Sequence, residues 1–289
     1  MTGNSLINLD GLSKPATALI EKIGDAVGGV FKPYQIVRVA KAEAEASLIS
    51  AESQIQVSEL NVRAMHRFVE EESKKQANME AITAGALSLL QDNSKPQNID
   101  NDWIANFFDK SKIVSDTDMQ KFWARILAQE ANGPGAFARK TVNLLADLDR
   151  EDAELFVGLC RCCWAFAKEE VDSDKSVPIV FDVDAEIYKS NGVHFHSMTH
   201  LESFGLIRFE QMSGFARLNL PRSTALSYFG KQVNLTFPSE QGNSLAIGKV
   251  LWTRAGAQLS AICDSSPIEG LFEYTVQRWT SSGLIQQQA

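Results

Sequence analysis

The chain lacks any run of 18 or more apolar residues, although 44% of its 289 residues are hydrophobic. A helix that crosses a membrane needs about 20 consecutive apolar residues, so we expect no membrane-spanning segment. Residues 1–14, MTGNSLINLDGLSK, also lack the basic start and the apolar block of a signal peptide. We therefore expect a cytoplasmic protein, with a peripheral position at the inner membrane as the alternative.

An excess of basic side chains is also missing. The chain has 28 Lys and Arg against 36 Asp and Glu, which gives a formal net charge of −8. Broad, nonspecific nucleic-acid binding needs a basic surface, so this balance makes nucleic acid an unexpected partner. It also argues against adhesion to anionic lipid by charge alone.

Cysteine is scarce, with four in the whole chain. Cys160, Cys162 and Cys163 cluster in an apolar run, and Cys263 is distant in sequence. A disulfide framework would show regular pairs in a short secreted chain. We expect reduced cysteines that pack as small hydrophobic side chains.

The histidines offer a second set of possible metal ligands, because His194, His196 and His200 are close in sequence. Two sulfurs on adjacent residues do not fit the usual Cys-x₂₋₄-Cys spacing of a zinc site. His196 and His200 share a helix face, but the glutamate of an HExxH motif is absent. We therefore expect no metal and no cofactor.

Catalytic signatures are missing too. The chain has no Walker loop, no dinucleotide fingerprint and no Gly-x-Ser-x-Gly. Glu130 follows an apolar pair and precedes a Gly-Pro turn, so it could pair with Arg125 or Arg139, accept backbone N–H groups, or act as an acid. No second carboxylate stands beside it for acid–base catalysis, and we favour a structural carboxylate. The sequence predicts no enzyme and no catalytic residue.

The clearest feature that is present is a heptad-like series of positions spaced 4-3-4-3, eight of ten of them apolar. Such spacing keeps one seam of a helix facing a partner helix. The series also includes Lys41 and Ser58. The residues predicted to form the oligomer seam are Val37, Ala44, Leu48, Ala51, Ile55, Val62, Met65 and Val69.

The segment from Pro33 to about Met65 has no internal Gly or Pro. As a helix it would span roughly 50 Å, at about 1.5 Å per residue. A helix of this length finds little covering surface within one small domain. The pattern therefore predicts a homo-oligomer or a long antiparallel pairing.

A shorter amphipathic helix is predicted from Lys14 to about Phe31, with apolar residues at i, i+3, i+4 and i+7. It is either docked on the rest of the protein or presented to a membrane surface or a partner. The possible membrane or partner face consists of Leu19, Ile20, Ile23, Val27, Val30 and Phe31.

Four segments follow from these patterns. We predict a leader helix at 1–31, a helical oligomerisation segment at 32–95, a helical domain at 96–170 and an α+β domain at 171–289. The aromatic positions of the third segment are assigned to helices, including Trp164 and Phe166 on a helix that opens at Asp149. The predicted fold class is mainly α, with a long coiled-coil-like N-terminal helix, a central helical bundle and a C-terminal winged-helix-like domain.

The winged-helix interpretation depends on residues 178–265. The order of an apolar helix, "HLESFGLIRFE", strands and "VLWTRAGAQLSAI" resembles that of winged-helix domains. Residues 195–204, the presumed recognition helix, contain no Lys or Arg. A helix that reads DNA normally presents such groups, so protein contact is favoured over DNA contact.

The block MQKFWARILAQEANGPGAFARKTVNLLADLDREDAELF at 119–156 resembles a bacterial family, domain of unknown function 2806. The segment from Ala18 through KPYQIVRVAKAEAEA is similar to the N-terminal region of that family, so the resemblance covers about 15–160. The resemblance implies no activity. The Ala/Glu-rich helix is loosely similar in composition to helices of membrane-associated scaffolds and abortive-infection proteins.

Taken together, these features predict a non-enzymatic oligomeric scaffold or sensor. The expected setting is bacterial anti-phage defence, with action at a membrane surface as a further expectation. The expected partners are the chain itself, and another protein or a membrane surface. The alternative is a DNA-binding transcriptional regulator that uses the winged-helix-like domain.

Overall fold

The computed structural model describes residues 12–28, 59–166 and 176–285. The chain divides into two compact units, residues 1–146 and 147–289, called here the N-terminal and C-terminal units. Each is described by itself. The predicted division into four segments stays a prediction.

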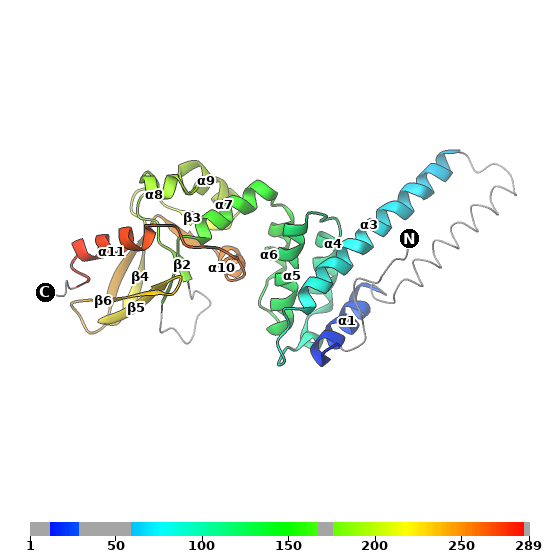
Figure 1. The fold of residues 1–289 in the computed structure, drawn as a ribbon, viewed down its shortest axis with the longest axis horizontal. Coiled ribbons are helices and arrows are strands. Elements are labelled where there is room, and N and C mark those ends of the chain that lie inside the picture. Colours follow the sequence, from blue (N-terminus) through cyan, green and yellow to red (C-terminus); the bar gives the residue numbers. More distant parts are fainter. Residues whose placement is uncertain (1–11, 29–58, 167–175, 286–289) are drawn as a thin grey trace. The chain divides into compact units, whose positions relative to one another are not determined.

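The described part of the N-terminal unit is helical (Figure 1). Side-chain caps begin several of its helices: Ser13 accepts a hydrogen bond from the Ala16 N–H, and Asp100 from the Trp103 N–H. The helices are α1 (Lys14–Val27), α3 (Glu59–Leu87), the 3₁₀ turn η1 (Pro96–Asn98), α4 (Asn101–Ser111), α5 (Thr117–Asn132) and α6 (Arg139–Ala146).

Aromatic side chains from α4 and α5 form the core of this unit. The Phe107 ring stacks on Trp103 and meets Trp123 edge-on, with ring centroids 5.2 Å apart in both pairs. The Trp103 indole N–H donates to the Phe137 carbonyl at 2.8 Å, which satisfies its polar atom. The predicted apolar stripes of both helices are therefore buried, as expected for amphipathic helices.

The C-terminal unit combines helices and antiparallel sheets (Figure 1). Its helices are α7 (Arg150–Cys160), α8 (Glu186–Lys189), α9 (Phe195–Ser203), α10 (Arg254–Ser260) and α11 (Leu271–Ser281). Its strands are β1 (Cys163–Phe166), β2 (Ser176–Pro178), β3 (Ile207–Phe209), β4 (Phe215–Leu220), β5 (Ser223–Tyr228), β6 (Lys231–Thr236), β7 (Asn243–Gly248) and β8 (Val250–Trp252).

Three sheets are formed among these described strands. The first has the order β2-β1-β5-β6, the second pairs β3 with β8, and the third pairs β4 with β7. Trp164 of β1 lies in the core, where its ring contacts Tyr228, Phe272 and Trp279 at centroid distances of 5.0, 5.6 and 4.9 Å. These contacts fix α11 against the first sheet.

The prediction of a mainly α-helical chain with a long coiled-coil-like helix is wrong, and the fold is mixed α+β. Trp164 and Phe166, assigned to a helix, lie on strand β1, because the helix from Arg150 ends at Cys160. In the strand they are two residues apart and both buried. In a short apolar run, periodicity alone does not separate a strand from a helix.

The prediction of a winged-helix-like domain is also wrong. Helix α9, strand β3 and helix α10 occur where the pattern places them. The strands between them, however, join two different sheets, since β5 pairs with β1 and with β6 in one sheet while β4 pairs with β7 in another. Strand partners depend on contacts between distant segments, which a local order of elements does not specify.

Candidate functional site

Helix α3 differs between its two halves. Its second half packs on α5 and buries Ile82, Thr83 and Ala86. Its first half exposes large apolar side chains: Leu60 is 65% exposed and Phe68 is 59% exposed. Figure 1 shows this first half extending beyond α4 and α5. A group of exposed apolar side chains on one element is a candidate interaction surface.

The described seam residues lie on this first half. Met65 is 43% exposed, and Val62 and Val69 are partly exposed. Continued with the same 4-3 spacing, the seam reaches Thr83 and Ala86, which are buried within the N-terminal unit. The seam therefore runs from a covered end to an exposed end. The other five seam residues, at 37, 44, 48, 51 and 55, lie outside the described residues.

Phe68 precedes the buried Ile82 by two heptads, so both side chains lie on the same side of α3. Lys75 lies midway between them on that side, and its ammonium is 2.6 Å from Glu72. The hydrogen bond to Glu72 raises the pKa of Lys75. We name Leu60, Val62, Met65, Phe68 and Val69 the α3 patch.

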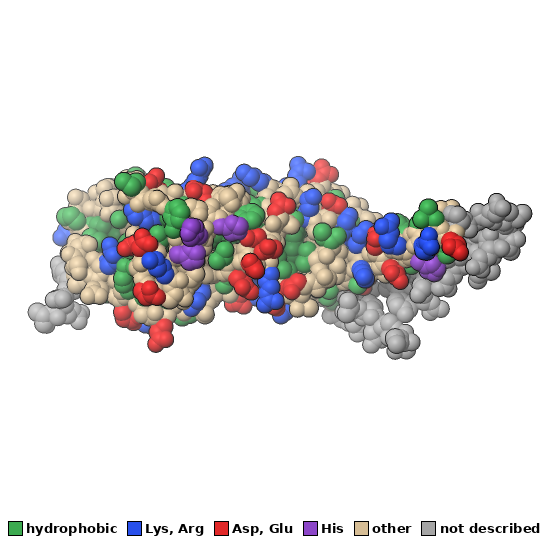
Figure 2. All heavy atoms as spheres, turned by 90° about the horizontal axis from the view of Figure 1, so that it is seen from above, with side chains coloured by type: hydrophobic (Ala, Val, Ile, Leu, Met, Phe, Trp, Pro, Cys, Tyr) green, Lys and Arg blue, Asp and Glu red, His purple; other side chains and the backbone are tan. Residues whose placement is uncertain are grey.

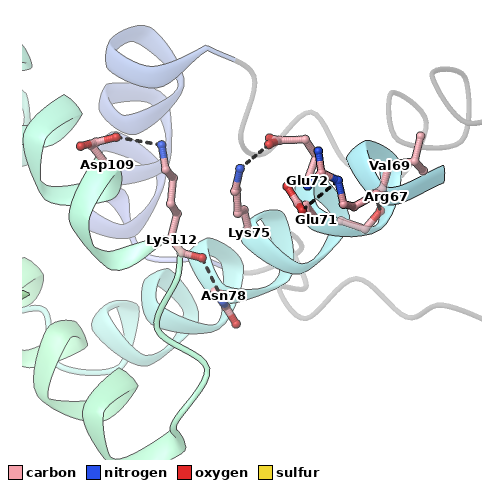
Figure 3. Close-up of polar contacts among 9 residues, drawn as sticks. Arg67, Val69, Glu71, Glu72, Lys75, Asn78, Asp109 and Lys112 are labelled. Atoms are coloured by element: carbon pink, nitrogen blue, oxygen red, sulfur yellow. Dashed lines mark hydrogen bonds and ion pairs between the residues drawn. The ribbon is translucent and has the colours of Figure 1, made fainter. Parts of the chain in front are cut away.

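Charged side chains accompany the α3 patch (Figure 3). Arg67 pairs with Glu71 at 3.7 Å, and Ser73 donates to the Val69 carbonyl at 2.7 Å. Exposed pairs of this kind contribute little to stability. They place charged side chains beside the exposed apolar side chains on the first half of α3.

One polar junction holds α3 against the end of α4, close to where burial begins (Figure 3). The Asn78 side chain donates to the Lys112 carbonyl at 2.9 Å, and Gln120 of α5 donates to the Asn78 side chain at 3.1 Å. Lys112 also pairs with Asp109 at 2.8 Å. The junction fixes the direction of α3 and hence of the α3 patch.

The predicted membrane or partner face of α1 is partly covered. Leu19 and Ile23 are fully buried, in a helix that contacts α4 and η1. Ile20 and Val27 are partly exposed, and residues 30 and 31 lie outside the described ranges. The two most central residues of that face therefore stabilise the N-terminal unit. No helix within the described ranges has the length and apolar character to cross a bilayer.

Glu130 holds a turn. It is 3% exposed, and its two carboxylate oxygens accept the Gly135 and Phe137 N–H groups at 2.6 and 2.8 Å. Burial raises the pKa of the Glu130 carboxyl and outweighs the opposing effect of these N–H groups. Of the roles left open by the sequence, these contacts match the structural carboxylate that accepts backbone N–H groups.

Three histidines belong to α9: His194 is its N-cap residue, and His196 and His200 lie within the helix. His194 caps the helix, since its Nδ1 accepts the Ser197 N–H at 3.4 Å. His200 Nε2 lies 2.6 Å from Asp152 of α7. The Asp152–His200 pair could not be predicted from the sequence, because its members are 48 residues apart.

Cys263, distant in sequence, shares a side-chain hydrogen bond with Cys160. Burial raises the pKa of both Cys160 and Cys163, which keeps them in the unreactive thiol form. In the part of the chain that the structure describes, no group of three or more His, Cys, Asp and Glu side chains is placed to hold a metal ion.

Comparison with known protein families identifies a match for most of the chain. A family model described as "Protein of unknown function (DUF2806)" matches residues 62–275. The match contains the block at 119–156 on which the sequence resemblance depends, and it extends through most of the C-terminal unit. No curated protein and no solved structure matches the chain.

Proposed function

The chain belongs to the DUF2806 family of proteins of unknown function, and we propose that it acts as a non-enzymatic scaffold or sensor that self-associates through the α3 patch. The observation that carries the proposal is the exposure of Leu60, Met65 and Phe68 on a helix whose other half packs on α5. Exposed apolar side chains in water are stabilised by association, roughly in proportion to the apolar area covered.

The occupant favoured for the α3 patch is a second copy of the same helix. Two copies can bury identical apolar faces symmetrically, as in most homo-oligomers. The flanking charges include both signs, with Arg63 and Arg67 beside Glu59 and Glu71. An antiparallel or staggered pair could therefore match these charges across the contact.

The proposal is tested by measuring the mass of the assembly formed by variants that lack apolar side chains of the α3 patch but keep the core. We expect Met65→Ser combined with Phe68→Ser to reduce the assembly to the 31.8 kDa chain in sedimentation velocity. Ile113→Ser is the matched control, because Ile113 is an apolar residue of the same unit that is 70% exposed and lies outside α3. An unchanged assembly in the double variant would contradict the proposed contact.

The setting in anti-phage defence and the action at a membrane surface stay predictions. For the membrane, the unburied part of the α1 face is smaller than the sequence suggested, because Leu19 and Ile23 are buried. Flotation of the full chain with anionic and with zwitterionic vesicles tests whether it binds a membrane surface.

The DNA-binding alternative also stays a prediction. Figure 2 shows acidic and basic side chains interspersed over the face in view. Helix α9 carries histidines but no Lys or Arg. Retention on DNA at low salt that weakens steeply with added salt would favour this alternative.

A further inference from the structure

The C-terminal unit contains a cavity of about 630 Å³, within the range of small-ligand sites. It lies at the turn between β5 and β6 and beside the start of α11. Its lining combines aromatic rings with charged groups of both signs. These side chains are Tyr228, Phe229, Phe272, Lys231, Glu269 and Glu273.

Hydrogen bonds fix one wall of the cavity. The Tyr228 hydroxyl donates to the Arg161 carbonyl at 2.9 Å and accepts the Ile268 N–H at 2.7 Å. The Arg161 side chain in turn donates to the Ser266 carbonyl at 3.2 Å. The loop before α11 is therefore held in place without a ligand, which lowers the entropic cost of binding.

Phe229 occupies a position that disfavours it. Tyr228 pairs with Lys231 across a two-residue turn, in which Phe229 has φ 44° and Gly230 has φ 86°. Two positive φ values are typical of a type I′ hairpin turn, for which Asn-Gly is preferred. A bulky side chain at positive φ is strained, and such strain is concentrated at functional sites. Phe229, which lines the cavity, is nevertheless 43% exposed.

One of the two carboxylates that line the cavity is paired with a lysine, and the other is not. The Lys231 ammonium lies 2.8 Å from Glu273 and 5.0 Å from the centre of the Phe272 ring, so this cation and anion compensate each other. Glu269 forms no ion pair or side-chain hydrogen bond with any residue that the structure describes. The lining therefore presents, among the described residues, one carboxylate without an ion-pair partner in the same cavity as the partly exposed Phe229.

We propose that this cavity binds the guanidinium group of an arginine on a partner protein. A guanidinium stacks on an aromatic face and donates paired hydrogen bonds to a carboxylate. Phe229 supplies the face and Glu269 the carboxylate. Lys231 repels a second cation, so the site takes one arginine rather than a basic tract. The proposal is independent of self-association through the α3 patch.

The probe is the tripeptide acetyl-Gly-Arg-Gly-amide, and its comparator carries citrulline, which is nearly isosteric and uncharged. Saturation-transfer NMR with the full chain measures both affinities. We expect binding of the arginine peptide to be about tenfold or more tighter, as for a charge-assisted hydrogen bond. Glu269→Gln should remove this preference. Glu151→Gln, which removes an exposed carboxylate of α7 outside the cavity, should keep it.

Phe229→Asn separates a functional role from a structural one. Asn fits the turn, so we expect a higher Tm together with weaker binding of the arginine peptide. Wild-type affinity in Phe229→Asn or in Glu269→Gln would overturn the proposal, and so would equal binding of the citrulline peptide. A lower Tm for Phe229→Asn would also count against it, because the ring would then be retained for packing.

Discussion

Asp152 and His200 are joined by a contact of 2.6 Å between Oδ1 and Nε2, which connects α7 to α9. The other carboxylate oxygen, Oδ2, accepts the Asp149 N–H at 2.9 Å and closes the capping box of α7. Burial acts to raise the pKa of Asp152, but the Asp149 N–H and the His200 ring outweigh it, so the pKa is lowered from 3.8. One side chain therefore stabilises both a helix start and a contact between helices.

Asp152→Asn should lower the free energy of unfolding by about 1–3 kcal/mol near neutral pH, because Asn has one acceptor oxygen in place of two. A lowered pKa means that the ionised form stabilises the fold above 3.8 and that this contribution is lost as pH falls through the folded pKa. The difference between wild type and variant should therefore shrink in acid. Urea denaturation at several pH values measures it, and a difference that grows in acid would contradict this account.

Glu130→Gln should destabilise the chain by about 1–3 kcal/mol, because the glutamine N–H₂ would face one of the two backbone N–H groups that the carboxylate accepts. Thermal unfolding measures the loss. Glu151→Gln, the same change at an exposed position, should leave Tm unchanged. Equal Tm values for the two variants would show that the Glu130 hydrogen bonds are replaceable.

Gly248→Ala should cost about 3 kcal/mol or more, or prevent folding. Gly248 has φ +102°, and a Cβ there would lie 2.0 Å from the Val180 carbonyl oxygen. Gly242→Ala is the control, because that residue also has positive φ but no atom within 4 Å of the added carbon. The control should lose only about 1 kcal/mol. Soluble yield and urea denaturation distinguish the two, and similar losses would mean that the backbone near Val180 can move.

Much of the N-terminal unit could be predicted from local patterns. The stripe with Trp103 and Phe107 identified α4, because apolar residues at helical spacing bury one face. The structural role of Glu130 also followed from its place between an apolar pair and a turn. Such features depend on residues close together in the sequence.

Less of the C-terminal unit could be predicted from local patterns, because its sheets and side-chain contacts join distant segments. The run with Trp164 was too short to separate strand from helix, and one of the two sheet partners of β1, strand β5, is distant in sequence, since Ala165 pairs with Ser227. The contacts Asp152–His200 and Cys160–Cys263 likewise depend on the fold. Phe229 was missed for another reason, because Phe-Gly is not a recognised type I′ signal.

The seam could be predicted in part: its spacing is a local pattern, but the element that covers it depends on the fold. Val62, Met65 and Val69, the seam residues that the structure describes, lie on α3, and the continuation of the spacing to Thr83 and Ala86 is buried. Spacing alone, however, did not reveal that the covering element there is α5 of the same unit. A heptad pattern specifies that a face is covered and leaves open which helix covers it.

The central claim is that the α3 patch joins copies of this chain. Static light scattering of the unmodified full chain at micromolar concentrations measures the particle mass without labels or partners. We expect a mass that is a whole-number multiple of 31.8 kDa, at least twice that value. A mass of 31.8 kDa throughout the concentration range would contradict the claim.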